Sequence, residues 1–246
     1  MDREEPRLFS IAVLSSDRLV VGDFTNHSVK LFDVVQDKVL HQLEVDDRPT
    51  SVGSLPKARV AVTLPSKNTI LILHCDSKLS IVDMITVQGW CWNIAYSNKL
   101  LIVLYENPRK IEIMNLNGSV VKQNELNMSK KIYWGDKLSV MTEGDVTSIY
   151  VVDYNNKRIL RLDENLQVQQ IYRLPDGAKP WGVLAVGENQ LLVGVFGGDI
   201  WQLDSTMGRW TRLGETWLIG SLAFCHERQV LYGADSSDSV KRYAIS

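Results

Sequence analysis

Basic and aromatic side chains are the residues of this 246-residue sequence whose types and spacing could support chemistry. The candidates for a binding surface are Trp90, Arg109, Lys110, Lys130, Lys131, Tyr133, Trp134, Lys157, Arg158, Lys179 and Trp181. Such a mixture can stack on bases and hold phosphates, as RNA-binding proteins do. It can equally anchor a protein partner, because Trp, Tyr and Arg dominate protein interfaces. The residue types alone leave both alternatives open.

Several of these residues also have a structural interpretation. Trp92 and Trp181 begin apolar strands, where Trp often packs between neighbouring units of a fold. Lys157 and Arg158 stand in a polar turn that needs solvated side chains, and Arg158 could pair with a neighbouring unit. Trp90 lies in a less regular segment, so either role is open for it.

Patterns for catalysis and metal binding are not found in the sequence. It has no GxSxG elbow, no phosphate-binding loop and no paired acids at a repeat mouth. The four histidines are scattered, and the three cysteines, Cys75, Cys91 and Cys225, form no CxxC. We therefore expect a non-enzyme with no catalytic residue, no metal and no cofactor, and reduced thiols that indicate a cytoplasmic location.

Composition narrows the possible partners. Lys and Arg number 27 against 29 Asp and Glu, which gives a formal net charge of -2 and excludes a generally basic nucleic-acid binder, although a local basic sector remains possible. No apolar run approaches the ~18 residues of a membrane span. The first ten residues, MDREEPRLFS, are too charged for a signal peptide. We expect neither membrane insertion nor secretion.

The elements that must position these residues repeat with a period near 42. In each repeat an apolar strand runs into a short polar turn and a second strand, as in LVVGDFTNHSVKLFDV and IYVVDYNNKRILRLDE. The aligned strand ends are Asp23, Leu64, Tyr105, Asp153, Val195 and Asp235, at steps of 41, 41, 48, 42 and 40 residues. Repeats of about 40 to 45 residues with four strands each are typical of β-propellers.

Six such units use the whole chain, so we predict an all-β, six-bladed β-propeller of four-stranded blades in a single domain. The blades are expected at about 8–45, 46–87, 88–126, 127–174, 175–216 and 217–246. The last unit has only three strands, so residues 2–7 are expected to supply its outer strand and close the ring. The propeller itself is expected to be monomeric.

The loops between blades and those between the second and third strands of each blade share one face of a propeller. On this face the basic residues come mostly from blades two to four, and Asp46, Asp47, Asp199, Asp235 and Asp238 lie on the other half. The long step into blade four places an insertion at 127–137, and insertions often map to a binding face. We therefore expect the site to be centred on blades three to five.

Calcium in a central channel, as six-bladed lactonases hold it, is a specific alternative. Calcium takes six to eight oxygen ligands. The inner strands offer Asn93 and no carboxylate, so this alternative is not favoured.

Three segments resemble NHL repeats, as found in the six-bladed C-terminal propellers of TRIM-type E3 ubiquitin ligases. They are DFTNHSVK at 23–30, DYNNKRIL at 153–160 and KPWGVLAV at 179–186. Blades two and three lack the Asp-x-x-Asn turn, since Leu64 and Tyr105 stand where Asp would be, so the resemblance is to a divergent branch.

The resemblance implies a non-catalytic recognition module that binds a ubiquitination substrate or other protein partner through the loop face. RNA binding through the basic and aromatic sector of the same face is the alternative. RING and B-box domains, which would carry the ubiquitin chemistry of a full-length parent, are not in this sequence.

Overall fold

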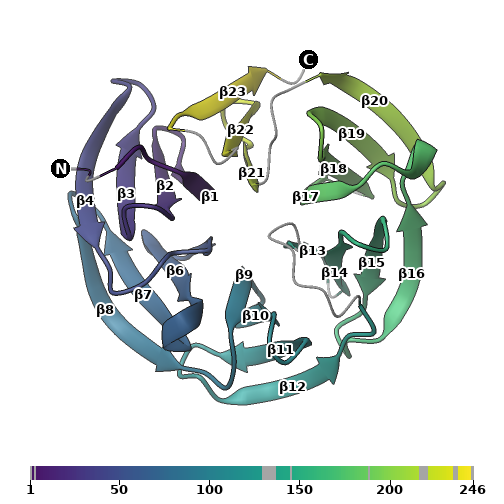
Figure 1. Ribbon diagram of the computed structural model, residues 1–246, viewed down its shortest axis with the longest axis horizontal. Helices are drawn as coiled ribbons and strands as arrows, with labels where there is room; N and C mark the ends of the chain where they lie inside the picture. Colours follow the sequence, from purple (N-terminus) through teal and green to yellow (C-terminus); the bar gives the residue numbers. More distant parts are fainter. Residues whose placement is uncertain are drawn as a thin grey trace.

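The computed structural model describes residues 2, 4–128, 137–144, 146–187, 189–215, 221–234 and 238–244. Their strands form six antiparallel sheets, which are arranged as blades around a central axis (Figure 1). In each blade the first strand lies nearest the axis and later strands lie further out. The predicted all-β, six-bladed propeller is confirmed.

The first three blades have four strands each, named a to d from the axis outward. Blade one contains β1 (Leu8–Ser15), β2 (Arg18–Asp23), β3 (Ser28–Asp33) and β4 (Lys38–Glu44). Blade two contains β5 (Ser51–Leu55), β6 (Arg59–Leu64), β7 (Thr69–Cys75) and β8 (Leu79–Thr86). Blade three contains β9 (Cys91–Ser97), β10 (Leu100–Tyr105), β11 (Lys110–Asn115) and β12 (Val120–Glu125).

The other three blades complete the ring. Blade four contains β13 (Leu138–Glu143), β14 (Val146–Asp153), β15 (Arg158–Leu162) and β16 (Val168–Arg173). Blade five contains β17 (Pro180–Gly187), β18 (Gln190–Val195), β19 (Asp199–Asp204) and β20 (Arg209–Glu215). Blade six contains β21 (Ser221–Cys225), β22 (Val230–Ala234) and β23 (Val240–Ala244). Two 3-10 turns, η1 (Pro65–Lys67) and η2 (Pro175–Gly177), are the helical segments of the described chain.

Burial explains the strand sequences. Strand β10 reads LLIVLY and is buried along its length after the first residue, because both of its faces meet other apolar side chains. The outer strand β12 reads VVKQNE and alternates between exposed and half-buried positions. Continuous apolar runs therefore mark inner strands, and more polar sequences mark the blade edges.

Apolar contacts between neighbouring blades form the core. Val20 of blade one packs in one cluster with Val60 and Val62 of blade two, and all three are fully buried. Burying such a side chain contributes about 1.5–3 kcal/mol relative to leaving it in water. Blades one and six meet in the same way, because Leu8 and Ala223 belong to a single cluster.

The ring is thus closed by packing, and the prediction that residues 2–7 form the outer strand of blade six is wrong for the described residues. The sheet of blade six has three strands, and residues 4–7 belong to no strand. The Glu4 N–H donates to Asn26 Oδ1 at 3.0 Å, and Asn26 Nδ2 donates to the Glu4 carbonyl at 3.0 Å. The Arg7 N–H donates to Asp23 Oδ1 at 3.1 Å. These bonds hold the segment against the turn of blade one, where acceptors and donors are available.

Deleting residues 2–6 should therefore destabilise blade one and leave the edge of β23 unchanged. The deletion removes the two exposed Glu4–Asn26 hydrogen bonds and the ion pair between Asp2 and Lys30, while Lys30 keeps its bond to Asp23. The free energy of unfolding should therefore fall by about 1–2 kcal/mol. Denaturant titration measures this loss, and analytical ultracentrifugation measures the assembly state. New self-association without loss of stability would contradict the placement of residues 4–7 against the turn of blade one.

Candidate functional site

One pocket opens on the face that carries the b–c and d–a loops. Its volume is about 420 Å³, and blades one to three contribute to its wall. The lining residues are Phe24, His27, Asp47, Arg48, Thr50, Pro65, Ser66, Trp90, Trp92 and Glu106. We call this the aromatic pocket. Concave sites with aromatic walls and a few polar groups are common ligand sites.

Trp90 stands at this pocket on a fixed backbone. Its N–H donates to the Asn107 carbonyl at 3.1 Å, and its carbonyl accepts from the Glu106 N–H at 3.0 Å. Gly89 has φ +127°, and a Cβ there would lie 2.8 Å from the Asn107 oxygen, so glycine permits this close approach. The Trp90 side chain nevertheless remains 45% exposed. Backbone hydrogen bonds between the segments of Trp90 and of Glu106–Asn107 thus fix a large apolar side chain that is exposed to solvent.

Behind the pocket lies a cluster of three rings, Phe9, Phe24 and Trp92, which we call the channel cluster. The Phe9 centroid lies 5.3 Å from that of Phe24 and 5.9 Å from that of Trp92. Trp92 is buried, which agrees with the structural interpretation of this residue. It packs against rings of blade one, however, and blade two lies between blades one and three. The contact therefore extends past the neighbouring blade toward the axis.

Lys137 meets the channel cluster from blade four, which lies across the ring from blade one (Figure 1). Its Nζ lies 4.2 Å above the centroid of the Phe9 ring. The side chain is 4% exposed, and among the residues that the structure describes Nζ has no hydrogen-bond partner. Burial lowers the pKa of Lys137 from 10.5 to about 7. Among the Lys and Arg residues that the structure describes, Lys137 has the largest pKa shift.

The polar wall of the aromatic pocket is also ordered. Asp47 is buried, and its Oδ2 accepts from the Ser66 N–H at 2.8 Å. Thr50 Oγ1 donates to the Trp92 carbonyl at 2.8 Å and so ties blade two to blade three. Glu106, which also lines the pocket, is buried. Two carboxylates thus share a pocket with three aromatic rings.

The Asp-x-x-Asn turns of blades one and four show why that motif is structural. Asp23 is fully buried, and its carboxylate accepts from Asn26 Nδ2 at 3.0 Å and from Lys30 Nζ at 2.7 Å. Burial by itself raises the pKa of Asp23, but the hydrogen bonds from Lys30, Asn26 and backbone N–H groups outweigh it, so the pKa is lowered. Asp153 accepts from Asn156 Nδ2 at 2.8 Å in the same arrangement.

The predicted basic residues lie in different surroundings. Arg158 pairs with Asp153 at 2.8 Å and donates to the Asn127 carbonyl at 2.9 Å, so it joins blades three and four. Lys110 pairs with Glu112 at 2.5 Å. Arg109 lines a second cavity of about 650 Å³ on the loop face, which shares Glu106 with the aromatic pocket. Lys157 is exposed in its turn.

Lys179 and Trp181 lie together in a separate aromatic cluster between blades four and five. Trp181 packs edge-on against Tyr154 at 5.4 Å and lies 5.3 Å from Phe196. Lys179 Nζ lies 5.0 Å above the Tyr154 ring. Trp181 is half-buried, in keeping with its structural interpretation, whereas Phe196 is exposed.

Four of the predicted site residues, Lys130, Lys131, Tyr133 and Trp134, lie outside the described residues. Trp90 and Arg109 lie in adjoining cavities, and the remaining predicted residues lie elsewhere on the loop face. Sequence reasoning missed Phe24 as a site residue, although it immediately follows the repeat position Asp23. Tyr154 and Phe196 follow Asp153 and Val195 in the same way, so the aligned repeats carried the signal.

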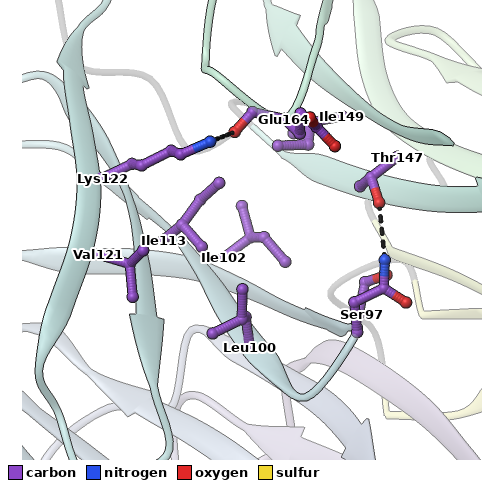
Figure 2. A pocket seen from close by; sticks show the side chains of 10 residues that line it. Ser97, Leu100, Ile102, Ile113, Val121, Lys122, Thr147, Ile149 and Glu164 are labelled. Atoms are coloured by element: carbon purple, nitrogen blue, oxygen red, sulfur yellow. Dashed lines mark hydrogen bonds between the residues drawn. The ribbon is translucent and has the colours of Figure 1, made fainter. Parts of the chain in front are cut away.

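A further cavity, of about 260 Å³, lies between blades three and four (Figure 2). Its floor is apolar and includes Leu100, Ile102 and Ile113. Lys122 Nζ donates to the Glu164 carbonyl at 3.0 Å, and this bond crosses the gap between the blades in Figure 2. The floor residues belong to the cluster that joins the two blades. We interpret this cavity as a gap between packed blades.

Other reactive groups are few. Burial raises the pKa of the Cys75 thiol and that of the Cys91 thiol to about 12, so both stay protonated at neutral pH. Within the described ranges no group of three or more His, Cys, Asp or Glu side chains is placed to hold a metal ion. No helix in those ranges has the length and apolar character that a membrane crossing needs.

Comparison with known proteins gives similarity in fold. No protein-family model matches the chain, and no curated protein matches it either. Virginiamycin B lyase from Staphylococcus aureus is 12% identical, with a TM-score of 0.70 over 99% of this chain and 86% of that one. Hydrazine synthase from Kuenenia stuttgartiensis is 14% identical, with a TM-score of 0.69 over 100% and 97%.

A protein of unknown function from Bacteroides thetaiotaomicron is also similar, at 14% identity and a TM-score of 0.80 over 99% of this chain and 70% of that one. Two of these three structures are of enzymes, but identities this low carry no active site from one chain to another. The similarity establishes that this chain has the six-bladed β-propeller fold.

Proposed function

We propose that the protein is a non-catalytic recognition module that binds a protein partner through the loop face, with the aromatic pocket as its main contact. The observation that carries this proposal is the exposed Trp90 side chain, held by two loops at the rim of a 420 Å³ pocket. Trp is enriched among interface hot spots, which become buried in pockets when the partner binds. The propeller fold is consistent with such a binding role.

A ubiquitination substrate of a TRIM-like ligase is the kind of partner that the NHL-like segments suggest. The segments at 23–30, 153–160 and 179–186 carry this resemblance, and the first two contain the Asp-x-x-Asn turn. In blades one and four this motif forms buried carboxylate networks that stabilise turns. The resemblance therefore concerns residues that stabilise the turns of the loop face, and a stable loop face is suited to recognition.

RNA binding is the weaker alternative on charge grounds. Arg158 and Lys110 are each paired with a carboxylate of this chain, so neither offers an unopposed charge to a phosphate. The aromatic pocket contains two carboxylates, which repel phosphates. Both features favour a protein partner over RNA.

Selection of a displayed random-peptide library on the purified protein tests the proposal. The selected peptides should bind Trp90→Ala at least ~30-fold more weakly, because truncating a hot spot costs about 2 kcal/mol or more. Met207→Ala is the matched control, since Met207 is 72% exposed in the turn between β19 and β20, on the opposite face. The melting temperature should be nearly unchanged in both variants.

Two results would contradict the proposal. Equal losses in both variants would place the binding surface elsewhere. Tight binding of mixed RNA oligonucleotides that weakens steeply with salt would favour the RNA alternative, because phosphate contacts release counterions.

The earlier expectation of a site on blades three to five stays a separate prediction. Replacing Trp134 with Ala and reversing the charges at Lys130 and Lys131 should abolish peptide binding if the partner also covers that region. Binding that survives these changes but not Trp90→Ala would confine the contact to blades one to three.

A further inference from the structure

The aromatic pocket combines aromatic rings with acidic side chains. Three rings, Phe24, Trp90 and Trp92, line it, and so do the carboxylates of Asp47 and Glu106. Both acidic residues are more than nine-tenths buried. Carboxylates kept out of water strengthen the attraction for a cation, and ring faces add to that attraction.

The charges of the lining residues point in the same direction. Arg48 is the one lining residue with a permanent positive charge, and its guanidinium carbon lies 5.1 Å from the Phe24 centroid. Among the Asp, Glu, Lys and Arg residues of the lining, two are acidic and one is basic, so their formal charges sum to -1. An anionic ligand would meet two carboxylates and a single guanidinium that already covers a ring. A cationic ligand would be attracted by the two carboxylates and repelled only by the one guanidinium.

We infer that the aromatic pocket takes the cationic side chain of a partner protein, Lys or Arg, with its charge toward Asp47 and Glu106 and its alkyl stem against the indole rings. This inference rests on the proposed function and names the chemistry of the partner. Arg48 shows that a guanidinium already stacks on one ring of this pocket. Both Lys and Arg have an alkyl stem that can lie on apolar surface while the charge contacts polar groups.

Small cations test the inference without knowledge of the partner. The probes are n-butylguanidinium and n-butylammonium, and n-butyrate is the anion of similar size. Titration of the ¹⁵N-labelled protein at constant ionic strength should shift the indole N–H signals of Trp90 and Trp92 saturably with either cation. Butyrate should leave both signals in place. The Trp210 indole in β20 is an internal reference.

Substitutions at the charged wall residues make the test specific. Asp47→Asn keeps the oxygen that accepts from Ser66 and removes the charge, so cation affinity should fall about tenfold. Glu106→Gln should act in the same direction and provides a second reading if Asp47→Asn folds poorly. Arg48→Gln should raise cation affinity by about threefold, because it removes a like charge.

The inference fails if butyrate saturates the Trp90 and Trp92 signals, or if Arg48→Gln weakens binding and both carboxylate variants leave it unchanged. The failure of the proposed function looks different. If library peptides depend on Trp90 but bind through an Asp or Glu side chain, the proposed recognition function stands and the inference of a cationic ligand is wrong. Cations that bind while no peptide does would overturn recognition and leave the pocket chemistry in place.

Discussion

At pH 6, Lys137→Met should unfold with a free energy on the order of 3 kcal/mol higher than the wild-type protein. Lys137 is buried, and its Nζ has no hydrogen-bond partner among the residues the structure describes. Burial lowers its pKa from 10.5 to about 7, and each pKa unit corresponds to about 1.36 kcal/mol. The cation–π interaction between the amine and the Phe9 ring offsets this cost by up to about 2 kcal/mol. Desolvation is therefore the larger effect, and an apolar side chain of similar length avoids it.

The pH dependence of this difference has a definite sign. The unfolded chain protonates Lys137 below pH 10.5, and the folded protein does so only below about pH 7. Between these values the unfolded state binds more protons, so this residue makes the wild-type stability rise with pH. The advantage of Lys137→Met should be complete below pH 7, shrink as pH rises, and vanish near pH 10.5.

Thermal unfolding of both proteins at pH 6, 8 and 10 measures the effect, with an expected rise in melting temperature of about 2–4 °C per kcal/mol for a chain of this size. Lys38→Met is the matched control, because Lys38 is exposed at the start of β4 and should give a small, pH-independent change. A constant difference across this range, or a loss of stability in Lys137→Met, would mean that the amine is solvated or paired in the folded protein.

The repeat could be predicted from the sequence because each blade needs similar apolar strands at a similar spacing. Strands such as LLIVLY can only be buried on both faces, so the period of about 42 predicted six blades. Closure of the ring was not legible in the same way. Residues 2–7 have no strand pattern of their own, and the backbone N–H groups of Glu4 and Arg7 donate to Asn26 and Asp23 in the turn of blade one.

The candidate site was only partly predictable for a related reason. Trp90 drew attention by its residue type, but Asp47 and Glu106 belong to blades two and three and meet through loops of irregular length. Lys137 is further removed, since its contact with Phe9 joins blades four and one across the axis. Contacts between distant repeats depend on the geometry of the closed ring, which no local pattern records.

Asp23→Asn should lower the free energy of unfolding by about 3–5 kcal/mol at pH 7, because it leaves a buried cation with half of its partners. Lys30 is almost fully buried, and its Nζ contacts Asp23 at 2.7 Å and the more exposed Asp2 at 2.8 Å. Replacing both residues of the buried pair, as Asp23→Asn with Lys30→Met, should recover a large part of the loss. Denaturant unfolding of the two single variants and the double variant isolates the coupling between them.

The same pair predicts how acid acts on blade one. The pKa of Asp23 is lowered in the folded protein, so its contribution to stability is present above pH 4 and is lost as pH falls through the folded value. Asp23→Asn should therefore be less sensitive to acid than the wild-type protein, although it is less stable at pH 7.

Asp153→Asn provides the comparison that identifies the cause. Asp153 holds an equivalent turn in blade four, but its cation, Arg158, is partly exposed and also donates to the Asn127 carbonyl. Arg158 can therefore reach water when the charge at 153 is removed, whereas Lys30 is confined. The loss in Asp153→Asn should be smaller than in Asp23→Asn, and Arg158→Met should recover little of it. Equal losses at both turns, with equal recovery, would mean that the turn hydrogen bonds dominate and that burial of the cation has little influence.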